Sequence, residues 1–125
     1  MFSHIMVGAN DLDRAKTFYD AVLGAIGVPP GTVDRHRVFY RTPTGVFGVS
    51  LPIDGEAATH ANGATIGFAC ANSDQADAFH AAGVANGGVS IEDPPGVRDG
   101  GFGKLYLAYL RDPDGNKLCA LHRMG

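Results

Sequence analysis

Two side chains in this sequence could take part in chemistry, one by acid–base transfer and the other as a nucleophile or metal ligand. His4 lies near one end of the sequence and Cys119 near the other. An imidazole that titrates near neutral pH suits proton transfer, which makes His4 the candidate catalytic residue. A thiol becomes a reactive thiolate beside a positive group, and His4 is the one such neighbour that the sequence offers Cys119. The alternative for both residues is a structural role. His4 would then be a hydrogen-bonded residue in the wall of a cavity, and Cys119 would be an inert buried side chain.

A long loop supplies further candidates. Residues 90–103, SIEDPPGVRDGGFG, combine Pro, Gly and mixed charges, and a loop of this length is more often functional than a simple connection. Arg98 lies in this loop and Lys104 directly follows it. A cation at either position would meet a carboxylate or phosphate on a ligand. The alternative for both is solvated surface charge. Tyr106 follows and would either line a cavity or fill it.

Several other classes of site and partner are not indicated. We find no phosphate-cradling glycine motif, no nucleophile-elbow serine and no carboxylate pair at a convincing spacing. The net charge is -3, without a run of like charges that could follow a nucleic acid backbone. No apolar run reaches the roughly 18 residues of a membrane span, and no signal peptide is evident. We therefore expect a cytoplasmic protein with no nucleic acid partner and no membrane partner.

The elements that must position these residues follow an internal repeat. Residues 4–28 lie without a gap on residues 65–89. Seven of the 25 aligned positions are identical, namely Ile5 and Ile66, Asp13 and Asp74, Ala15 and Ala76, Phe18 and Phe79, Ala21 and Ala82, Gly27 and Gly88, and Val28 and Val89. This level of identity is higher than chance alignment readily produces, so we infer two copies of one structural unit. At 125 residues the two copies share one domain.

Each copy is predicted to begin with a strand and a helix. Alternating side chains predict strands over residues 2–7 and 65–70. Asp11 and Asn72 are predicted helix N-caps, each followed by apolar residues at helical spacing. The apolar stripe of the second helix is the thinner one, so we expect this helix to pack closer to its sheet. Further strands are predicted over residues 37–41, 46–51, 104–110 and 116–122.

The predicted fold class is therefore α+β, with two tandem β-α-β-β-β modules in a single domain, residues 1–125. The first module covers residues 1–52, the polar segment 53–63 is the linker, and the second module covers residues 64–125. Such a module leaves one face of its small sheet without a helix. Two modules must therefore combine.

This pattern resembles the vicinal oxygen chelate superfamily, which holds glyoxalase I, extradiol dioxygenases and bleomycin-resistance proteins. The resemblance rests on the opening HIMVGANDLDRAKTFYDAVLG, the closing DPDGNKLCAL and the repeat itself. It implies paired modules whose strands form a curled mixed sheet, a cup that holds a metal or a ligand. It also implies a homodimer.

The resemblance further assigns four positions inside the cup. Metal-dependent members place ligands, usually His or Glu, at positions that here hold His4, Ser50, Thr65 and Cys119. A catalytic divalent site needs about three good ligands, and neutral hydroxyls do not neutralise a dication. We therefore expect no metal and no other cofactor. If a divalent ion such as zinc or nickel does bind, His4 and Cys119 are its expected ligands.

The predicted function is small-molecule binding in the cup, without the metal chemistry of glyoxalase I. Gly48, Gly67 and Ala69 on the cup-facing strands would leave room for a ligand. The expected binding residues are His4, Ser50, Thr65, Arg98, Tyr106 and Cys119.

Two alternatives stay open. One is a metal-dependent lyase or isomerase that is similar to lactoylglutathione lyase but has altered ligands. The other is a drug-sequestering protein similar to the bleomycin-resistance proteins, in which acidic pockets at a dimer interface bind a cationic ligand. If the protein is an enzyme, the resemblance implies a glyoxalase-like lyase or isomerase.

Overall fold

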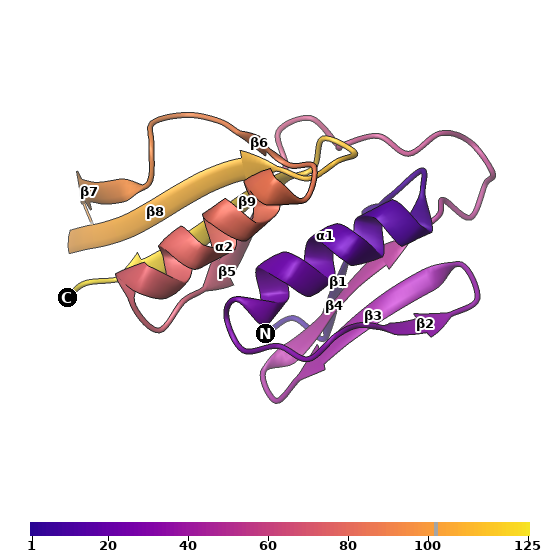
Figure 1. Ribbon diagram of the computed structural model, residues 1–125, viewed down its shortest axis with the longest axis horizontal. Helices are drawn as coiled ribbons and strands as arrows, with labels where there is room; N and C mark the ends of the chain where they lie inside the picture. Colours follow the sequence, from indigo (N-terminus) through magenta and orange to yellow (C-terminus); the bar gives the residue numbers. More distant parts are fainter. Residues whose placement is uncertain (102) are drawn as a thin grey trace.

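Two helices occupy corresponding places in the two halves of the chain (Figure 1). The computed structural model describes residues 1–101 and 103–125, and its two helices are α1 (Leu12–Gly24) and α2 (Ser73–Ala85). The side chain of Asp11 accepts a hydrogen bond from the Arg14 backbone N–H at 3.0 Å, and Asn72 accepts one from Gln75 at 2.8 Å. Both predicted N-caps are confirmed. Among the described residues, no helix is long and apolar enough to span a membrane.

The first sheet contains the strands of the first half of the chain. Its strands are β1 (His4–Gly8), β2 (Thr32–Asp34), β3 (Arg37–Thr42) and β4 (Gly45–Ser50). They lie in the order β1-β4-β3-β2, with β1 parallel to β4 and the other pairs antiparallel. Three of these strands agree with the sequence prediction to within two residues at each end. The short strand β2 is wholly exposed, so it has no apolar alternation from which to predict it.

The second sheet repeats this arrangement with one additional strand. Its strands are β5 (Ile66–Ala69), β6 (Val89–Ser90), β7 (Gly96–Gly100), β8 (Gly103–Arg111) and β9 (Lys117–Arg123). They lie in the order β5-β9-β8-β6, and β7 also pairs with β8. The prediction of a loop throughout residues 90–103 is wrong for Ser90 of β6 and for β7, because the backbone of β8 supplies hydrogen-bond partners to segments whose own composition does not favour a strand. The two curled mixed sheets with their helices confirm the predicted α+β fold class.

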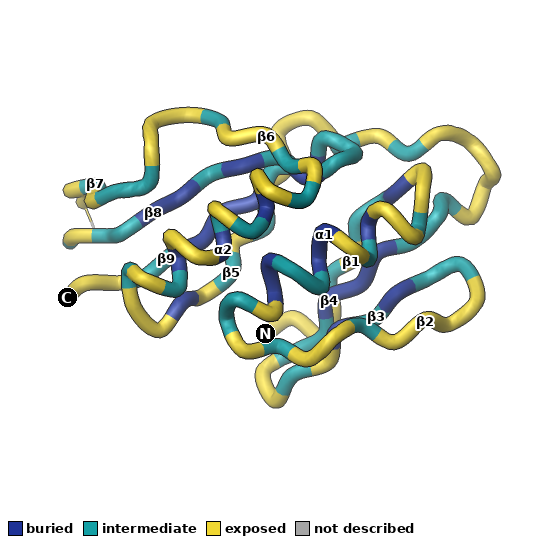
Figure 2. Tube along the Cα trace, viewed as in Figure 1, coloured by how far each residue is buried: buried dark blue, intermediate teal, exposed yellow. Residues whose placement is uncertain are grey.

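The helices lie side by side and cover one face of each sheet (Figures 1 and 2). A chain of aromatic rings runs through the core between them. The ring of Tyr19 in α1 lies 4.9 Å from that of Phe47, Phe47 lies 5.2 Å from Phe68 in the second sheet, and Phe68 lies 5.5 Å from Phe79 in α2. Each such pair adds roughly 0.5–1.5 kcal/mol beyond its buried area. The two halves therefore share one core.

Gly83 allows α2 to approach its sheet and α1 closely. A Cβ atom at this position would collide with Leu110 of β8 and would lie 3.2 Å from both Phe18 and Val22 of α1. Only glycine leaves this space free. The thin apolar stripe of α2 is thus matched by close packing on two sides.

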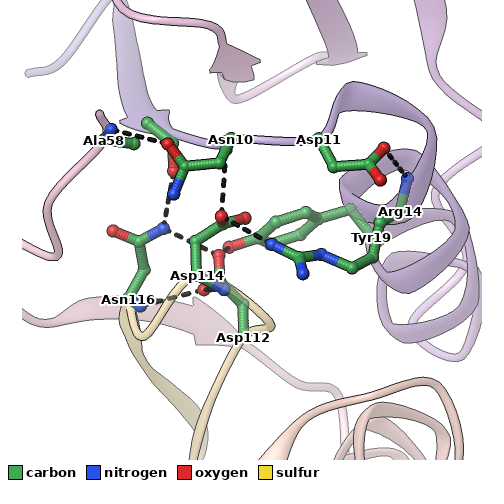
Figure 3. Close-up of polar contacts among 9 residues, drawn as sticks. Asn10, Asp11, Arg14, Tyr19, Ala58, Asp112, Asp114 and Asn116 are labelled. Atoms are coloured by element: carbon green, nitrogen blue, oxygen red, sulfur yellow. Dashed lines mark hydrogen bonds and ion pairs between the residues drawn. The ribbon is translucent and has the colours of Figure 1, made fainter. Parts of the chain in front are cut away.

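The turn between β8 and β9 joins the two halves through a buried carboxylate (Figure 3). Asp112 is 3% exposed, and its Oδ2 accepts hydrogen bonds from the Tyr19 hydroxyl at 2.5 Å and from the Asn116 side chain at 2.8 Å. The Asn116 amide also donates to the Gly8 carbonyl at 3.0 Å. This turn, Asp112–Asn116, is therefore a clamp between the halves as well as a turn.

A second carboxylate of the clamp holds the segment that enters α1. Asp114 Oδ1 accepts hydrogen bonds from the Asn10 backbone and from the Arg14 guanidinium, both at 2.9 Å. The Asn10 side chain in turn accepts a hydrogen bond from the Ala58 backbone at 2.7 Å, which ties the predicted linker to β1 and α1 (Figure 3).

The corresponding turn of the first half has no such clamp. Residues 41–45 read RTPTG, where residues 111–115 read RDPDG, so threonines stand in place of both aspartates. Among the described residues, the side-chain hydrogen bonds of this first turn stay within it, from Thr42 to Thr44 and to Gly45. One junction between the halves is clamped, and its counterpart is left open.

We predict that the Tyr19 hydroxyl contributes measurably to stability. In Tyr19→Phe the buried Asp112 carboxylate loses one donor, so the free energy of unfolding should fall by about 1–3 kcal/mol in urea titrations. Tyr106→Phe is the matched control, because the Tyr106 hydroxyl donates to an exposed Asp77, and its change should stay within about 0.5 kcal/mol. Equal losses in the two variants would show that the clamp does not join the halves energetically.

Candidate functional site

Each sheet has an open face that no helix covers. Because side chains alternate along a strand, His4 and Met6 of β1 point away from the core that Val7 faces. Residue pairing places Gly48 beside Met6 on the open face of the first sheet. On the second sheet, the open face carries Cys119, which pairs with Gly67 on one side and with Tyr109 on the other.

The predicted residues of the first half lie on this open face but make only local hydrogen bonds. His4 is exposed, and its Nδ1 lies 2.8 Å from the Ser3 hydroxyl. The Ser50 hydroxyl donates to the Leu51 carbonyl at 2.7 Å. Ser50 is therefore already engaged with the backbone, whereas the His4 ring faces solvent.

Burial favours the protonated form of the Cys119 thiol. The residue is 4% exposed, and burial is the largest of the effects that raise the pKa of its thiol above the ordinary value. Its neighbour Glu92 raises this pKa further, whereas a hydrogen bond with Tyr109 and the charge of Lys117 oppose the rise. A thiol in such surroundings is a weak nucleophile and a weak metal ligand near neutral pH.

The other predicted residues have structural partners or lie apart. Arg98 donates to the backbone carbonyls of Asp93 and Pro94, at 3.1 and 3.0 Å, and so supports the segment before β7. Tyr106 lies on the helix side of β8 and donates to Asp77 of α2 at 2.7 Å. Thr65 is exposed just before β5. The structure therefore does not bring all six predicted residues together in one chain.

The side chains that would have to hold a divalent metal do not suit one. Within residues 1–101 and 103–125, no group of three His, Cys, Asp or Glu side chains is placed to bind an ion. Of the four family positions, Ser50 is engaged by the backbone and the Cys119 thiol is protonated. His60, a histidine that could otherwise serve as a ligand, lies away from these positions, against Gly115 and in a hollow of about 140 Å³. A single chain thus offers His4 as its one conventional ligand at these positions.

A groove opens between the halves beside the turn of residues 41–45, and we call this place the unclamped junction. Its volume is about 670 Å³, which lies within the usual range for small-molecule sites. Its walls come from the start of β1, the end of α1, the turn between β3 and β4, and the strand β5. The apolar side chains of these walls are Phe2, Ile5, Leu23, Ile26, Val28, Pro29, Pro43, Val46, Phe47, Ile66, Phe68 and Ala69.

The polar lining of the groove is sparse and carries no carboxylate. Among the described residues that line it, the charged or titratable side chains are Arg41, His4 and Tyr40, and neither Asp nor Glu is present. The Arg41 guanidinium lies 4.9 Å from the centre of the Phe39 ring. The Tyr40 hydroxyl is turned toward Asp20, to which it donates at 2.7 Å, and burial raises its pKa well above the usual range.

Sequence reasoning identified His4, Gly67 and Ala69 but missed the other residues of this groove. Arg41 stands in a predicted strand and gives no signal by itself. The comparison of RTPTG with RDPDG could have indicated that one junction lacks acidic residues. In the sequence, the apolar residues at the end of α1 cannot be distinguished from ordinary core residues. Helical spacing does not show that the end of a helix extends beyond the core.

Comparisons with known proteins agree with this fold. The family model of the Glyoxalase/Bleomycin resistance protein/Dioxygenase superfamily matches residues 1–120. No curated protein matches the chain.

Solved structures with the same fold are also known. A glyoxalase/bleomycin resistance protein from Albidiferax ferrireducens T118 is 64% identical, with 98% of each chain covered and a TM-score of 0.96. A glyoxalase-related enzyme from Fulvimarina pelagi is 19% identical, with 98% of this chain and 88% of that chain covered and a TM-score of 0.75. A glyoxalase/bleomycin resistance protein/dioxygenase family enzyme from Burkholderia phytofirmans PsJN is 17% identical, with 96% of each chain covered and a TM-score of 0.72.

We predict that both cysteines react slowly with a disulfide reagent such as DTNB. Because burial raises the pKa of the Cys119 and Cys70 thiols, both stay protonated near neutral pH, and their rates should rise as the pH climbs beyond the ordinary thiol pKa of about 8.5. In the folded protein the rates should be at least about tenfold lower than in denaturant. The variants Cys70→Ser and Cys119→Ser separate the two signals. A Cys119 thiol that reacts equally fast in folded and denatured protein would contradict its protonated state.

Proposed function

Because the chain belongs to the glyoxalase/bleomycin resistance protein/dioxygenase superfamily, we propose that it binds a small molecule and does so without the metal centre of glyoxalase I. The observation that carries this proposal is the groove at the unclamped junction. It combines an adequate volume, apolar walls and a few polar side chains, which is the usual composition of a ligand site.

The chemistry of the family positions supports the second part of the proposal. Glyoxalase I chemistry needs a metal to stabilise an enediolate and a carboxylate base to move a proton. Ser50 and Cys119 stand where a carboxylate would be expected, and neither side chain can replace one. Among the residues that line the groove, His4 is the side chain suited to proton transfer near neutral pH. Any lyase or isomerase activity would therefore rely on His4.

A homodimer is the second element of the proposal. The strands β1 and β5 each have a hydrogen-bonded neighbour on one edge, and among the described residues neither has one on the other edge. Both open faces also carry apolar side chains, of which Met6 is 36% exposed and Leu121 is partly exposed. Free edges and uncovered apolar faces favour association. A second copy would bring the open faces of two chains together into the predicted cup.

The ligand proposal is tested by thermal-shift screening of a small-molecule library against the untagged protein. Hits should raise the melting temperature, because a ligand that binds only the folded state stabilises it. Their effect should survive chelation with EDTA. In Gly67→Phe a ring is added beside the groove where a Cβ meets open space, so the hits should lose most of their shift.

Gly100→Phe is the matched control for this screen. A Cβ at Gly100 would also meet open space, but this residue does not line the groove. Hits that stabilise wild type and Gly67→Phe equally would contradict the groove as their site. Stabilisation that disappears with EDTA and returns with zinc or nickel would contradict metal-independent binding.

The dimer proposal predicts a mass in light scattering of twice the 13.0 kDa of the chain. Met6→Lys places a charge on the open face of the first sheet, so it should shift the equilibrium toward the monomer, whereas Val84→Lys on the exposed side of α2 should not. A wild-type protein that stays monomeric at the highest concentrations would contradict the dimer.

A further inference from the structure

We infer that the groove selects uncharged aromatic molecules, whose rings lie against the apolar side chains on the helix side of the two sheets. The inference rests on the proposed function and adds the chemical class of the ligand. Its basis is the face of each strand from which the lining side chains come. This site is separate from the open faces, where the family positions His4, Ser50 and Cys119 lie.

The strand register of the first sheet places the apolar part of the groove on the helix side. Ile5 of β1 pairs with Phe47 of β4, and Phe47 pairs with Tyr40 of β3, so these three side chains share one face. The rings of Phe47 and Tyr40 lie 4.9 and 6.4 Å from that of Tyr19 in α1. This face is therefore the one that α1 covers, and the groove continues the core at its edge.

The charged side chains of the groove come from the other face. Val46 pairs with His4 on one side and with Arg41 on the other, and all three alternate with the helix-side residues. The Arg41 guanidinium lies over the ring of Phe39, on the same open face. Among the described residues that line the groove, neither Asp nor Glu is present. A ligand on the helix side therefore meets no charged partner.

Polar side chains on the helix side already have hydrogen-bond partners. The Tyr40 hydroxyl donates to the Asp20 carboxylate at 2.7 Å, and the Thr42 hydroxyl donates to the Gly45 carbonyl at 3.0 Å. A polar ligand would have to displace these bonds to form its own, with little net gain. Affinity on this side therefore comes from the apolar surface that a ligand covers.

The end of α1 disfavours charge on the ligand as well. Leu23 lies in the last turn of α1, and Ile26 and Val28 follow the helix and line the same wall. The helix dipole is negative at this end, and the last turn has no basic residue to offset it, so an anion is repelled. A cation is attracted only weakly by a helix end, which does not replace the water that it loses. An uncharged ligand has neither disadvantage.

Aromatic rings give the groove a preference among uncharged ligands. The rings of Phe47 and Phe68 lie 5.2 Å apart at 77°, and those of Tyr40 and Phe47 lie 6.3 Å apart. All three residues line the groove, and Phe68 is partly exposed. The ring of a ligand would extend this cluster by a further edge-to-face or offset pair, which a saturated ring cannot form.

The test uses isothermal titration calorimetry with four probes of similar size, namely naphthylmethanol, its saturated decahydro analogue, naphthoate and naphthylmethylammonium. Naphthylmethanol should bind wild type at least about tenfold more tightly than either charged probe, because each charge loses water without gaining a partner. It should also bind at least about threefold more tightly than the saturated analogue, because only the aromatic probe pairs with the rings of the groove.

Phe68→Leu removes a ring from the groove and keeps an apolar side chain. It should remove most of the preference for naphthylmethanol over the saturated analogue. Phe39→Leu is the matched control, because Phe39 lies on the open face and does not line the groove, and it should leave all four affinities unchanged. Melting temperatures show whether the variants fold. The comparison of probes on wild type tests the inference even if Phe68→Leu does not fold.

The outcomes separate this inference from the proposed function. A charged probe that binds as tightly as naphthylmethanol, equal affinities for the two neutral probes, or an aromatic preference that survives Phe68→Leu would overturn it. If library compounds bind and none of the four probes does, the inference fails and small-molecule binding stands. If neither the probes nor the library compounds bind, both fail. Naphthylmethanol affinity that falls as the protein dimerises would show that the groove is an interface between copies, and would also overturn the inference.

Discussion

The hydrogen bonds of one buried carboxylate hold the two halves of this protein in a single arrangement. Asp112 accepts from Tyr19, which lies 93 positions earlier in the chain, and from Asn116, which itself reaches the end of β1. A buried carboxylate that lost these donors would be costly, so the halves cannot separate at this junction without a large loss of stability. The packed aromatic rings from Tyr19 to Phe79 also join the two halves, through apolar contacts in the core.

The same architecture without the aspartates leaves the other junction open. Where the second half has Asp112 and Asp114, the first half has Thr42 and Thr44, whose side-chain hydrogen bonds to described residues stay within their own turn. The space that results is lined mainly by apolar side chains, and the described lining holds no acidic side chain. The absence of a clamp at this turn thus leaves room for the candidate site. A stable clamp at one end allows an open groove at the other.

Local signals in the sequence predicted much of the fold. Periodicity and caps predicted both helices, and alternation predicted most strands. The strands β2, β6 and β7 were missed, since β2 and β6 are short and wholly exposed and β7 depends on backbone partners in β8. Periodicity, caps and alternation depend only on residues that are close in the sequence, so they carry no information on how the halves dock.

The candidate site was harder to predict for the same reason. His4 was expected in a pocket and lines the groove. The groove depends on the end of α1, the turn before β4 and the edge of β5, which only the docking of the halves brings together. The other expected binding residues lie on the open sheet faces or have structural partners, and they are Ser50, Thr65, Arg98, Tyr106 and Cys119.

The most direct measurement is a methyl-labelled NMR titration of the protein with a compound identified by the thermal-shift screen. If the unclamped junction is the ligand site, the shift changes should concentrate on Leu23, Ile26, Val28 and Ile66, which line the groove. Leu107 and Leu121 face the open side of the second sheet and should stay unchanged. Changes confined to those two leucines, or none at all with the compound at saturation, would contradict the groove as the site of binding.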